Sequence, residues 1–380
     1  MDGDASGLAP LASLVMTVLE QLLASIGPVD PEAAGVARRR QDQLTKPPRS
    51  LGRLEDISIQ LAAIRGGIDV SLARRAVLVF AADHGVVAEG VSAYPADVTA
   101  QMVLNFLAGG AAVNAIAQSV GARVVVTDAG VAGDVLPHHP RLRRLGVRAG
   151  TGNMVREAAM TPAQARAALE GGARVFGEVA GEGLDLVAVG DMGIGNTTAA
   201  TALVSVFCGV DPRPLVGRGT GLDDAGVQRK ATAIEMALQR HRPRAADPVG
   251  TLAAVGGLEI AAIAGAILAS ASARVPVVVD GHIATAGALV AAALAPATTG
   301  YMFAGHRSQE PAHAVALAHL GLRPVLDLEM RLGEGTGALL AMPILAAAAA
   351  VLAGMATFQE AAVSGPAGDQ ASTGRPGDSV

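Results

Sequence analysis

From residue 75 onward, short apolar runs rich in β-branched residues alternate with stretches long enough to form helices. The runs cover 76–82, 123–127, 184–190 and 275–279, with two shorter candidates at 300–304 and 324–328. Strands that are apolar throughout and alternate with helices are typical of a parallel sheet covered on both faces. The pattern therefore predicts an α/β fold built on a parallel sheet.

A polar residue or a glycine follows each of these runs. The residues directly after them are Asp83, Asp128, Asp191, Asp280, Gly305 and Glu329. In open α/β sheets, ligands bind outside the carboxyl ends of the strands. Asp and Gly residues that merely mark turns would explain any single case, but they explain the repeated occurrence at one edge less well. We therefore expect the functional site at this edge.

The two ends of the chain carry a different pattern. Residues 11–26 show helical periodicity that ends at Gly27-Pro28, and apolar residues recur at helical spacing over 51–64. In the cationic stretch 44–53 between them, Pro47 and Pro48 bar a helix. This stretch could contact an anion or form an ordinary charged turn, and the turn is favoured. Residues 364–380 are rich in Gly, Pro, Ser and Asp, which predicts a disordered tail.

An uncharged run from 335 to 358 is long enough to span a membrane. Its alanine content, Pro343 and the lack of flanking basic residues favour a buried helix instead. The N-terminus, Met1-Asp2-Gly3-Asp4, is acidic and so unlike the start of a signal peptide. We therefore expect a soluble protein without a membrane partner.

Composition narrows the function classes. The chain has 380 residues, room for about two domains or one large α/β domain with attachments. Aromatic residues make up only 2%, so the core must be built from Ala, Val, Leu and Ile. The net charge of −5 offers no basic footprint for nucleic acid. The single cysteine, Cys208, excludes an intrachain disulfide framework and fits a reducing cytosol.

The segment 329–338 combines two carboxylates, an arginine and three glycines directly before the apolar run. Glycines allow backbone and ligand to approach closely. A carboxylate at the mouth of an apolar helix can have a raised pKa and accept a proton. On the residues alone, Glu329 and Glu334 are both candidates, and a loop with a solvated glutamate remains the alternative.

Two glycine loops carry candidate phosphate contacts. Residues 190–198 join a strand to a predicted helix at 199–207, and a helix N-terminus favours an anion. The alternative is simple capping by Thr197 or Thr198. Residues 217–224 lead into a predicted helix at 225–239, where Lys230 could meet a phosphate, although a solvated surface lysine is the favoured interpretation. A third loop, 150–154, is weaker evidence of the same kind.

The loop 83–95 mixes apolar residues with Ser92 and Tyr94, and Gln101 follows it. Such a segment could line a mostly apolar pocket. Asp83 and His84 suggest a metal site, but neighbours on an extended chain point apart and no third ligand follows at a recognisable spacing. We therefore expect no metal here.

Taken together, these segments resemble one known family. The blocks that carry the resemblance are 44–53, 81–106, 190–198, Lys230, 247–265, 279–281 and 330–342. They resemble the nicotinate-nucleotide–dimethylbenzimidazole phosphoribosyltransferases, which make α-ribazole phosphate for the lower ligand of cobalamin. The resemblance implies a Rossmann-like parallel sheet flanked by helices, a smaller helical domain formed by both chain ends, and a cytoplasmic homodimer.

The domain boundaries that follow are a terminal helical segment at 1–70, a Rossmann-like domain at 71–330, the catalytic loop with C-terminal helices at 331–363, and the tail at 364–380. The resemblance also assigns roles. It implies that Glu334 is the catalytic base. It places Ser92, Tyr94, Gln101 and Leu332 around the aromatic base. It places Asp191, Gly193, Asn196, Thr197, Gly219, Lys230, Asp280 and Arg331 at the nucleotide, with Asp191 standing where the family has a glutamate.

The implied chemistry needs one proton acceptor and neither a metal nor a redox cofactor. The nitrogen of the nicotinate ring is already cationic, so nicotinate leaves without a protein acid. A benzimidazole nitrogen attacks the anomeric carbon from the opposite face, and a single carboxylate takes the proton that becomes acidic. Transfer to adenine, a phenol or another azole, and a non-catalytic nucleotide-binding module, remain as alternatives. A dinucleotide dehydrogenase is disfavoured because no matching glycine fingerprint is present.

Overall fold

The computed structural model describes residues 16–133 and 136–365. Within them, six parallel strands form one sheet in the order β3-β2-β1-β4-β5-β6. The strands are β1 Arg75–Ala82, β2 Ala122–Gly130, β3 Leu142–Arg144, β4 Leu186–Met192, β5 Val277–Val279 and β6 Met302–Ala304. This is the doubly wound Rossmann order, in which the strand order reverses between β1 and β4 while all strands stay parallel. The predicted parallel α/β fold is confirmed.

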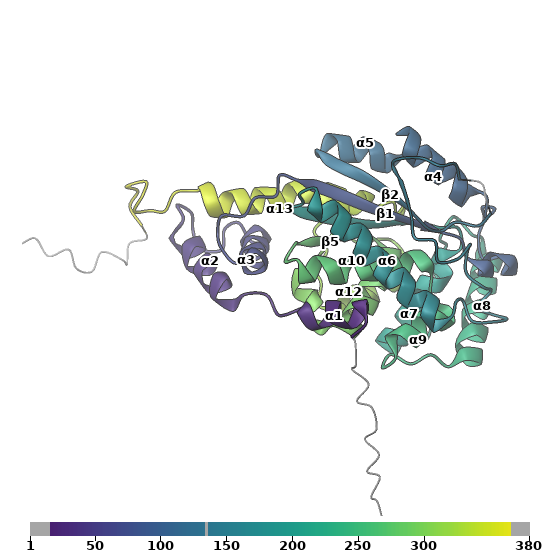
Figure 1. The fold of residues 1–380 in the computed structure, drawn as a ribbon. Coiled ribbons are helices and arrows are strands. Elements are labelled where there is room, and N and C mark those ends of the chain that lie inside the picture. The colour runs from purple at the N-terminus through teal and green to yellow at the C-terminus, as the bar shows by residue number, and fades with distance from the viewer. Residues whose placement is uncertain (1–15, 134–135, 366–380) are drawn as a thin grey trace, which may run out of the picture.

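Helices cover both faces of the sheet (Figure 1). Leu78 and Phe80 of β1 belong to the core cluster that includes α6, α7, α10 and α11, whereas Val77 and Val79 belong to the cluster that includes α3, α4, α5 and α13. This alternation follows from the two-residue period of a strand. The bounds on the first face are α6 Pro162–Gly181, α7 Asn196–Cys208, α10 Leu258–Ser272 and α11 His282–Leu294. Those on the second are α3 Arg53–Arg65, α4 Val98–Ala108, α5 Ala112–Ser119 and α13 Thr336–Gly354.

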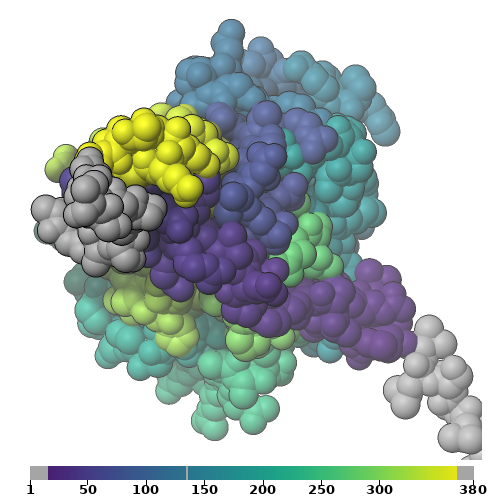
Figure 2. Space-filling view, turned by 90° about the vertical axis from the view of Figure 1, so that its left-hand side faces the viewer, coloured from purple at the N-terminus to yellow at the C-terminus, as the bar shows by residue number. Residues whose placement is uncertain are grey.

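The remaining helices lie outside these two layers or complete them. They are α1 Val18–Ser25, α2 Pro31–Gln43, α8 Asp224–His241, α9 Pro248–Val255 and α12 Pro311–Leu320. Figure 1 shows α2 and α3 beside the C-terminal half of α13. Figure 2 shows the purple N-terminal residues next to the yellow C-terminal segment. A small apolar cluster of Ala37, Ala62 and Leu352 joins these three helices.

One predicted strand is absent, and one strand of the sheet was not predicted. Residues 324–328 form no strand, only an isolated bridge between Leu326 and His306. Val325 and Leu326 donate backbone hydrogen bonds to Ala304 O and Gly305 O just past β6, but the pairing is too short to form a strand. The missing sixth strand is β3, which is only three residues long and carries Arg143 and Arg144, so it offered no apolar run. The predicted tail lies outside the described residues from 366 onward.

Helix α13 occupies most of the apolar run 335–358. By length and composition α13 could span a membrane, as could the apolar stretch Val98–Ser119. However, Ala338, Leu339, Met342 and Leu345 on one side of α13 are fully buried in the core against the sheet. This packing agrees with the prediction of a buried helix, and Pro343 lies inside it.

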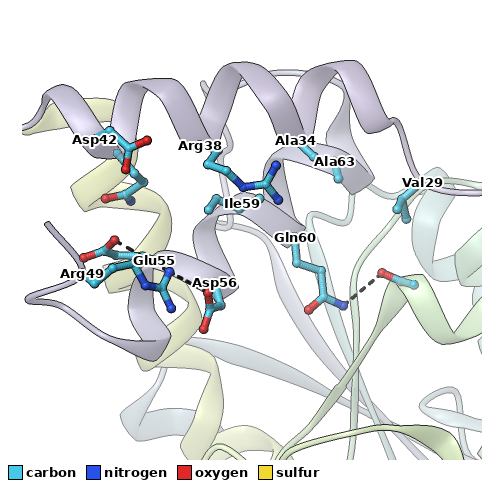
Figure 3. Close-up of a pocket in the computed structure, with 12 residues that line it drawn as sticks. Val29, Ala34, Arg38, Asp42, Arg49, Glu55, Asp56, Ile59, Gln60 and Ala63 are labelled. Atoms are coloured by element: carbon cyan, nitrogen blue, oxygen red, sulfur yellow. Dashed lines mark hydrogen bonds and ion pairs between the residues drawn. The ribbon is translucent and has the colours of Figure 1, made fainter.

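The cationic stretch 44–53 forms a turn beside a cavity of about 550 Å³ between α2 and α3 (Figure 3). Its cations have partners within the chain. Lys46 Nζ lies 2.9 Å from Glu55 Oε1, and Arg49 Nη1 lies 2.8 Å from Asp56 Oδ1. The favoured interpretation as a charged turn therefore agrees with the structure.

Candidate active site

A cavity of about 510 Å³ opens at the carboxyl ends of the strands. Its walls come from the end of β4, from the segments that follow β1, β4, β5 and β6, and from the loops before α8 and α13. Nine predicted site residues line it, namely Tyr94, Asp191, Gly193, Asn196, Thr197, Gly219, Arg331, Leu332 and Glu334. Four others, Ser92, Gln101, Lys230 and Asp280, do not line it. The edge expected from the strand-end residues is thus the edge that holds the cavity.

Glu334 is a buried carboxylate in this cavity, with 5% of its surface exposed. Its Oε2 accepts a hydrogen bond from Val113 N–H at 3.1 Å, near the start of α5. Burial raises the pKa of the Glu334 carboxyl, the Val113 N–H opposes this, and the charge of Asp280 adds to it. Glu329, by contrast, is exposed and does not line the cavity. Of the two carboxylates, Glu334 is therefore the one placed to accept a proton.

Glycines allow the loop of Glu334 to sit directly on the end of β4. A Cβ on Gly190 would overlap with the backbone nitrogen of Gly335. Gly333 and Gly335 have φ of +93° and +82°, values that side chains disfavour. Glu334 itself has φ +62°, a strained backbone that this anchoring maintains. The glycines around the carboxylate therefore serve the close approach that the sequence suggested.

Asp280 holds the same loop by hydrogen bonds to its backbone. Its Oδ2 accepts from Gly335 N–H at 3.2 Å and its Oδ1 from Ala338 N–H at 2.9 Å. These are N–H groups at the start of α13, which a carboxylate stabilises. Asp280 is fully buried, so it supports the Glu334 loop and does not form the cavity wall.

Asp191, near the end of β4, lies in the cavity wall next to the Glu334 loop and is 6% exposed. Its Oδ2 accepts from Asn196 Nδ2 at 2.9 Å, while its Oδ1 has no protein partner in the described chain. Burial raises the pKa of Asp191 well above its usual range, and the charges of Asp280 and Glu259 add to the shift. A carboxyl that keeps its proton can donate a hydrogen bond, which a carboxylate cannot.

Another part of the cavity wall, around the start of α7, has the features of an anion site. Helix α7 begins at Asn196 behind a left-handed Gly195, and neither Thr197 nor Thr198 caps it. Lys230 is completely buried, so the interpretation as a solvated surface lysine was wrong. Its Nζ donates to Thr197 Oγ1 at 2.7 Å. The Thr197 hydroxyl is thus left to donate its own proton, and it lies on the cavity wall at a helix N-terminus, where an anion is favoured.

The aromatic-base residues are divided between the rim and the outside. Tyr94 and Leu332 are 53% and 58% exposed at the mouth of the cavity. Ser92 is set back from the wall, with its Oγ 3.3 Å from Thr220 Oγ1. Gln101 is exposed on α4, where Val98 and Met102 line the cavity instead. A ligand at this end would therefore meet a mainly apolar rim.

The sequence analysis missed several wall residues, namely Met102, Thr220, His282, His306, Ser308 and Glu310. His282 and His306 follow β5 and β6 closely, so the rule that found Asp191 could have found them too. Burial lowers the pKa of His282 to about 3, which makes it a neutral wall residue at ordinary pH. Asp83 and His84 bind different partners, the Ala132 N–H and Glu259 Oε1, as expected for side chains that point apart.

Comparison with known proteins identifies the family. A family described as phosphoribosyltransferase matches residues 26–363. A nicotinate-nucleotide–dimethylbenzimidazole phosphoribosyltransferase of Chloroflexus aurantiacus is 54% identical over 349 residues, covering 92% of this chain and 99% of the relative. The enzyme of that name from Thermus thermophilus is 54% identical over 336 residues, covering 88% and 99%. Its crystal structure has a TM-score of 0.84 at 53% identity, over 88% of this chain and 99% of that one. The chain therefore belongs to the nicotinate-nucleotide–dimethylbenzimidazole phosphoribosyltransferase family.

Proposed function

We propose that this protein transfers the phosphoribosyl group of nicotinate mononucleotide to dimethylbenzimidazole with inversion, releasing nicotinate and α-ribazole phosphate. The observation that carries the proposal is the position of Glu334. This buried carboxylate has a raised pKa and faces a cavity whose wall includes both apolar side chains and the N-terminus of α7. The family relationship supports the same reaction.

The reaction needs one bond to form, one to break and one proton to move. A ring nitrogen of the acceptor forms the new bond to the anomeric carbon. The pair of electrons in the old C–N bond returns to the nicotinate ring nitrogen, which loses its positive charge. The acceptor's other ring nitrogen carries the single N–H, and this N–H becomes acidic once the attacking nitrogen is bonded to the anomeric carbon. Glu334 takes this proton, and a positioned general base contributes about 10²–10⁴-fold to the rate.

The two ends of the cavity suit the two substrates. We assign the acceptor to the rim formed by Tyr94, Met102 and Leu332, with Ser92 and Gln101 as outer contacts. We assign the nucleotide to the other end, where the residues are Asp191, Gly193, Asn196, Thr197, Gly219 and Arg331. Holding both substrates in line for attack contributes several kcal/mol more, on the order of 7–11 in favourable cases.

Lys230 and Asp280 act from behind the wall in this scheme. The Lys230 ammonium donates to Thr197 Oγ1 and supports phosphate binding through that hydroxyl and through its charge. Asp280 holds the loop of Glu334 through the N–H groups of Gly335 and Ala338. Neither role requires direct contact with a substrate.

We also propose that the described part of 1–70, from residue 16 onward, forms a smaller helical unit with 331–363, and that the protein is a homodimer. The packing of α2 and α3 on α13 supports the unit. Family membership indicates a soluble metabolic enzyme, and we propose the cytoplasm as its compartment, which suits a chain with one free cysteine. Light scattering of the purified protein should give about twice the chain mass of 37.9 kDa, and a mass of one chain would refute the dimer.

The experiment that tests the function is incubation of the pure protein with nicotinate mononucleotide and a mixture of acceptors. Dimethylbenzimidazole, adenine and a phenol compete in one tube, and products are separated by mass. The proposal predicts that the dimethylbenzimidazole product dominates. Dominance of another product would reassign the acceptor, and no product with any of them would favour a non-catalytic nucleotide-binding module.

A further inference from the structure

The glycine loop at 217–220 is held by a carboxylate that the reaction itself does not use. Glu310 precedes α12 and is 7% exposed. Its Oε1 accepts from Gly219 N–H at 3.0 Å. The carboxylate lies so close to Gly217 that a Cβ there would overlap with Oε2. Glycine at position 217 is therefore what allows Glu310 to reach the loop.

Lys230 meets the same loop at neighbouring atoms. Its Nζ lies 3.5 Å from Gly217 O, and a Cβ on Gly219 would come within 3.3 Å of that nitrogen. Arg331 holds the loop at a third point, since its Nη1 donates to Gly219 O at 3.0 Å. Glu310 and Lys230 therefore both contact the segment 217–219. Gly219 of this segment lines the cavity, in the part assigned to the nucleotide.

The charge of Lys230 is poorly compensated where it lies. In the part of the chain that the structure describes, its hydrogen bonds go to a hydroxyl and a carbonyl, and no carboxylate lies within ion-pair distance. Burial lowers the pKa of Lys230 to about 8, and the charge of Glu310 opposes this effect. Two further groups face this end. His282 is neutral because its pKa is about 3, and Arg331 is cationic and so gives Lys230 no support.

Resting on the phosphoribosyl transfer proposed above, we propose that Glu310 is a positioning residue for the nucleotide phosphate. Its carboxylate seats the 217–220 loop through Gly219 N–H, and its negative charge keeps the buried Lys230 side chain cationic. A charged Lys230 holds the Thr197 oxygen as an acceptor, so that the Thr197 proton points to the ligand. A neutral amine would leave the phosphate without this nearby cation.

Replacement of Glu310 by Gln separates charge from hydrogen bonding, because the amide oxygen can still accept from Gly219 N–H. The assay is calorimetric binding of nicotinate mononucleotide alone, without acceptor, from pH 6.5 to 9. We expect binding to weaken with rising pH as Lys230 loses its proton. In E310Q this loss should move to lower pH by about one unit, which corresponds to roughly fivefold weaker binding near pH 8 and roughly tenfold at pH 9. At pH 6.5 the two proteins should differ much less.

Two controls make the result specific. In a Lys230→Met background, E310Q should change the dissociation constant by less than about twofold, since coupled residues lose their coupling when one is removed. Glu329→Gln removes an exposed carboxylate from a neighbouring loop and should leave the pH profile unchanged. If E310Q does not fold, Glu310→Asp keeps the charge and must keep the wild-type pH position, so a shifted profile in that variant contradicts the proposal.

The proposal is overturned if the E310Q profile superimposes on the wild-type profile, or if E310Q weakens binding equally in the Lys230→Met background. Failure of the proposed function would look different. In that case the wild-type protein would form no product with any acceptor, while nucleotide binding and its pH dependence could still be read.

Discussion

Replacing Glu334 with Gln tests the proposed base with little disturbance of the loop. The two side chains have nearly the same shape, and the amide oxygen can still accept the hydrogen bond from Val113 N–H. The backbone of residue 334 keeps the same strain at φ +62°, and Asp280 still holds Gly335. What disappears is the ability to take a proton.

The expected loss follows from the position of the carboxylate. Because Glu334 is only 5% exposed, bulk water has little access to replace it as proton acceptor. We expect kcat to fall by about 10²–10⁴-fold, which is roughly 3–5 kcal/mol of barrier. Binding of nicotinate mononucleotide should change by less than about twofold, because the substitution keeps the shape of the side chain and its hydrogen bond from Val113 N–H.

A matched acceptor separates proton transfer from other effects of the substitution. A dimethylbenzimidazole that carries a methyl group on one ring nitrogen can attack with the other, and it has no N–H proton to lose. Its slow transfer should be equal in wild type and E334Q, with products quantified by chromatography in single-turnover reactions. Full activity of E334Q with the natural acceptor, or the same loss with both acceptors, would refute the role of Glu334 as base.

Three further predictions concern the same site. Because burial raises the pKa of Glu334 above its ordinary value of 4.5, the base is lost by protonation as pH falls, so kcat should show an acid limb above pH 4.5 that is absent in E334Q; a flat wild-type profile would contradict this. Gly190→Ala would place a methyl group against the backbone of Gly335, so urea denaturation should show about 1–3 kcal/mol less stability and kcat should fall, whereas an unchanged midpoint would argue against the close contact. Leu332→Ala should raise the KM for dimethylbenzimidazole by roughly 3–10-fold through lost apolar contact, with the nucleotide KM and the melting temperature unchanged.

The parallel fold was predictable because its strands are buried on both faces and so appear as continuous apolar runs. Strand β3 was not, since its sequence, Leu142-Arg143-Arg144, carries no such run. The segment 324–328 misled for the opposite reason, because Val325 and Leu326 pack against the core while the pairing of the segment beside β6 is limited to a single bridge and a few hydrogen bonds. Local pattern thus reports burial, whereas pairing at a sheet edge depends on neighbours distant in sequence.

The site was predictable where polar residues lie at the carboxyl end of a strand, as with Asp191 in β4, or among clustered glycines, as with Glu334. Lys230 looked like a surface residue because its helix is amphipathic and its partner Thr197 lies 33 residues away. No local sequence pattern pointed to Glu310, because its role depends on its contact with Gly219, which is 91 residues distant. Only the fold brings these groups to one end of the cavity.

The most direct test of the proposed reaction is the anomeric configuration of the product. The purified protein is incubated with nicotinate mononucleotide and dimethylbenzimidazole, and the anomeric proton of the product is examined by NMR. Attack from the face opposite to the departing nicotinate predicts the α-configured riboside phosphate. A β-configured product, or release of nicotinate without transfer to the base, would contradict the account.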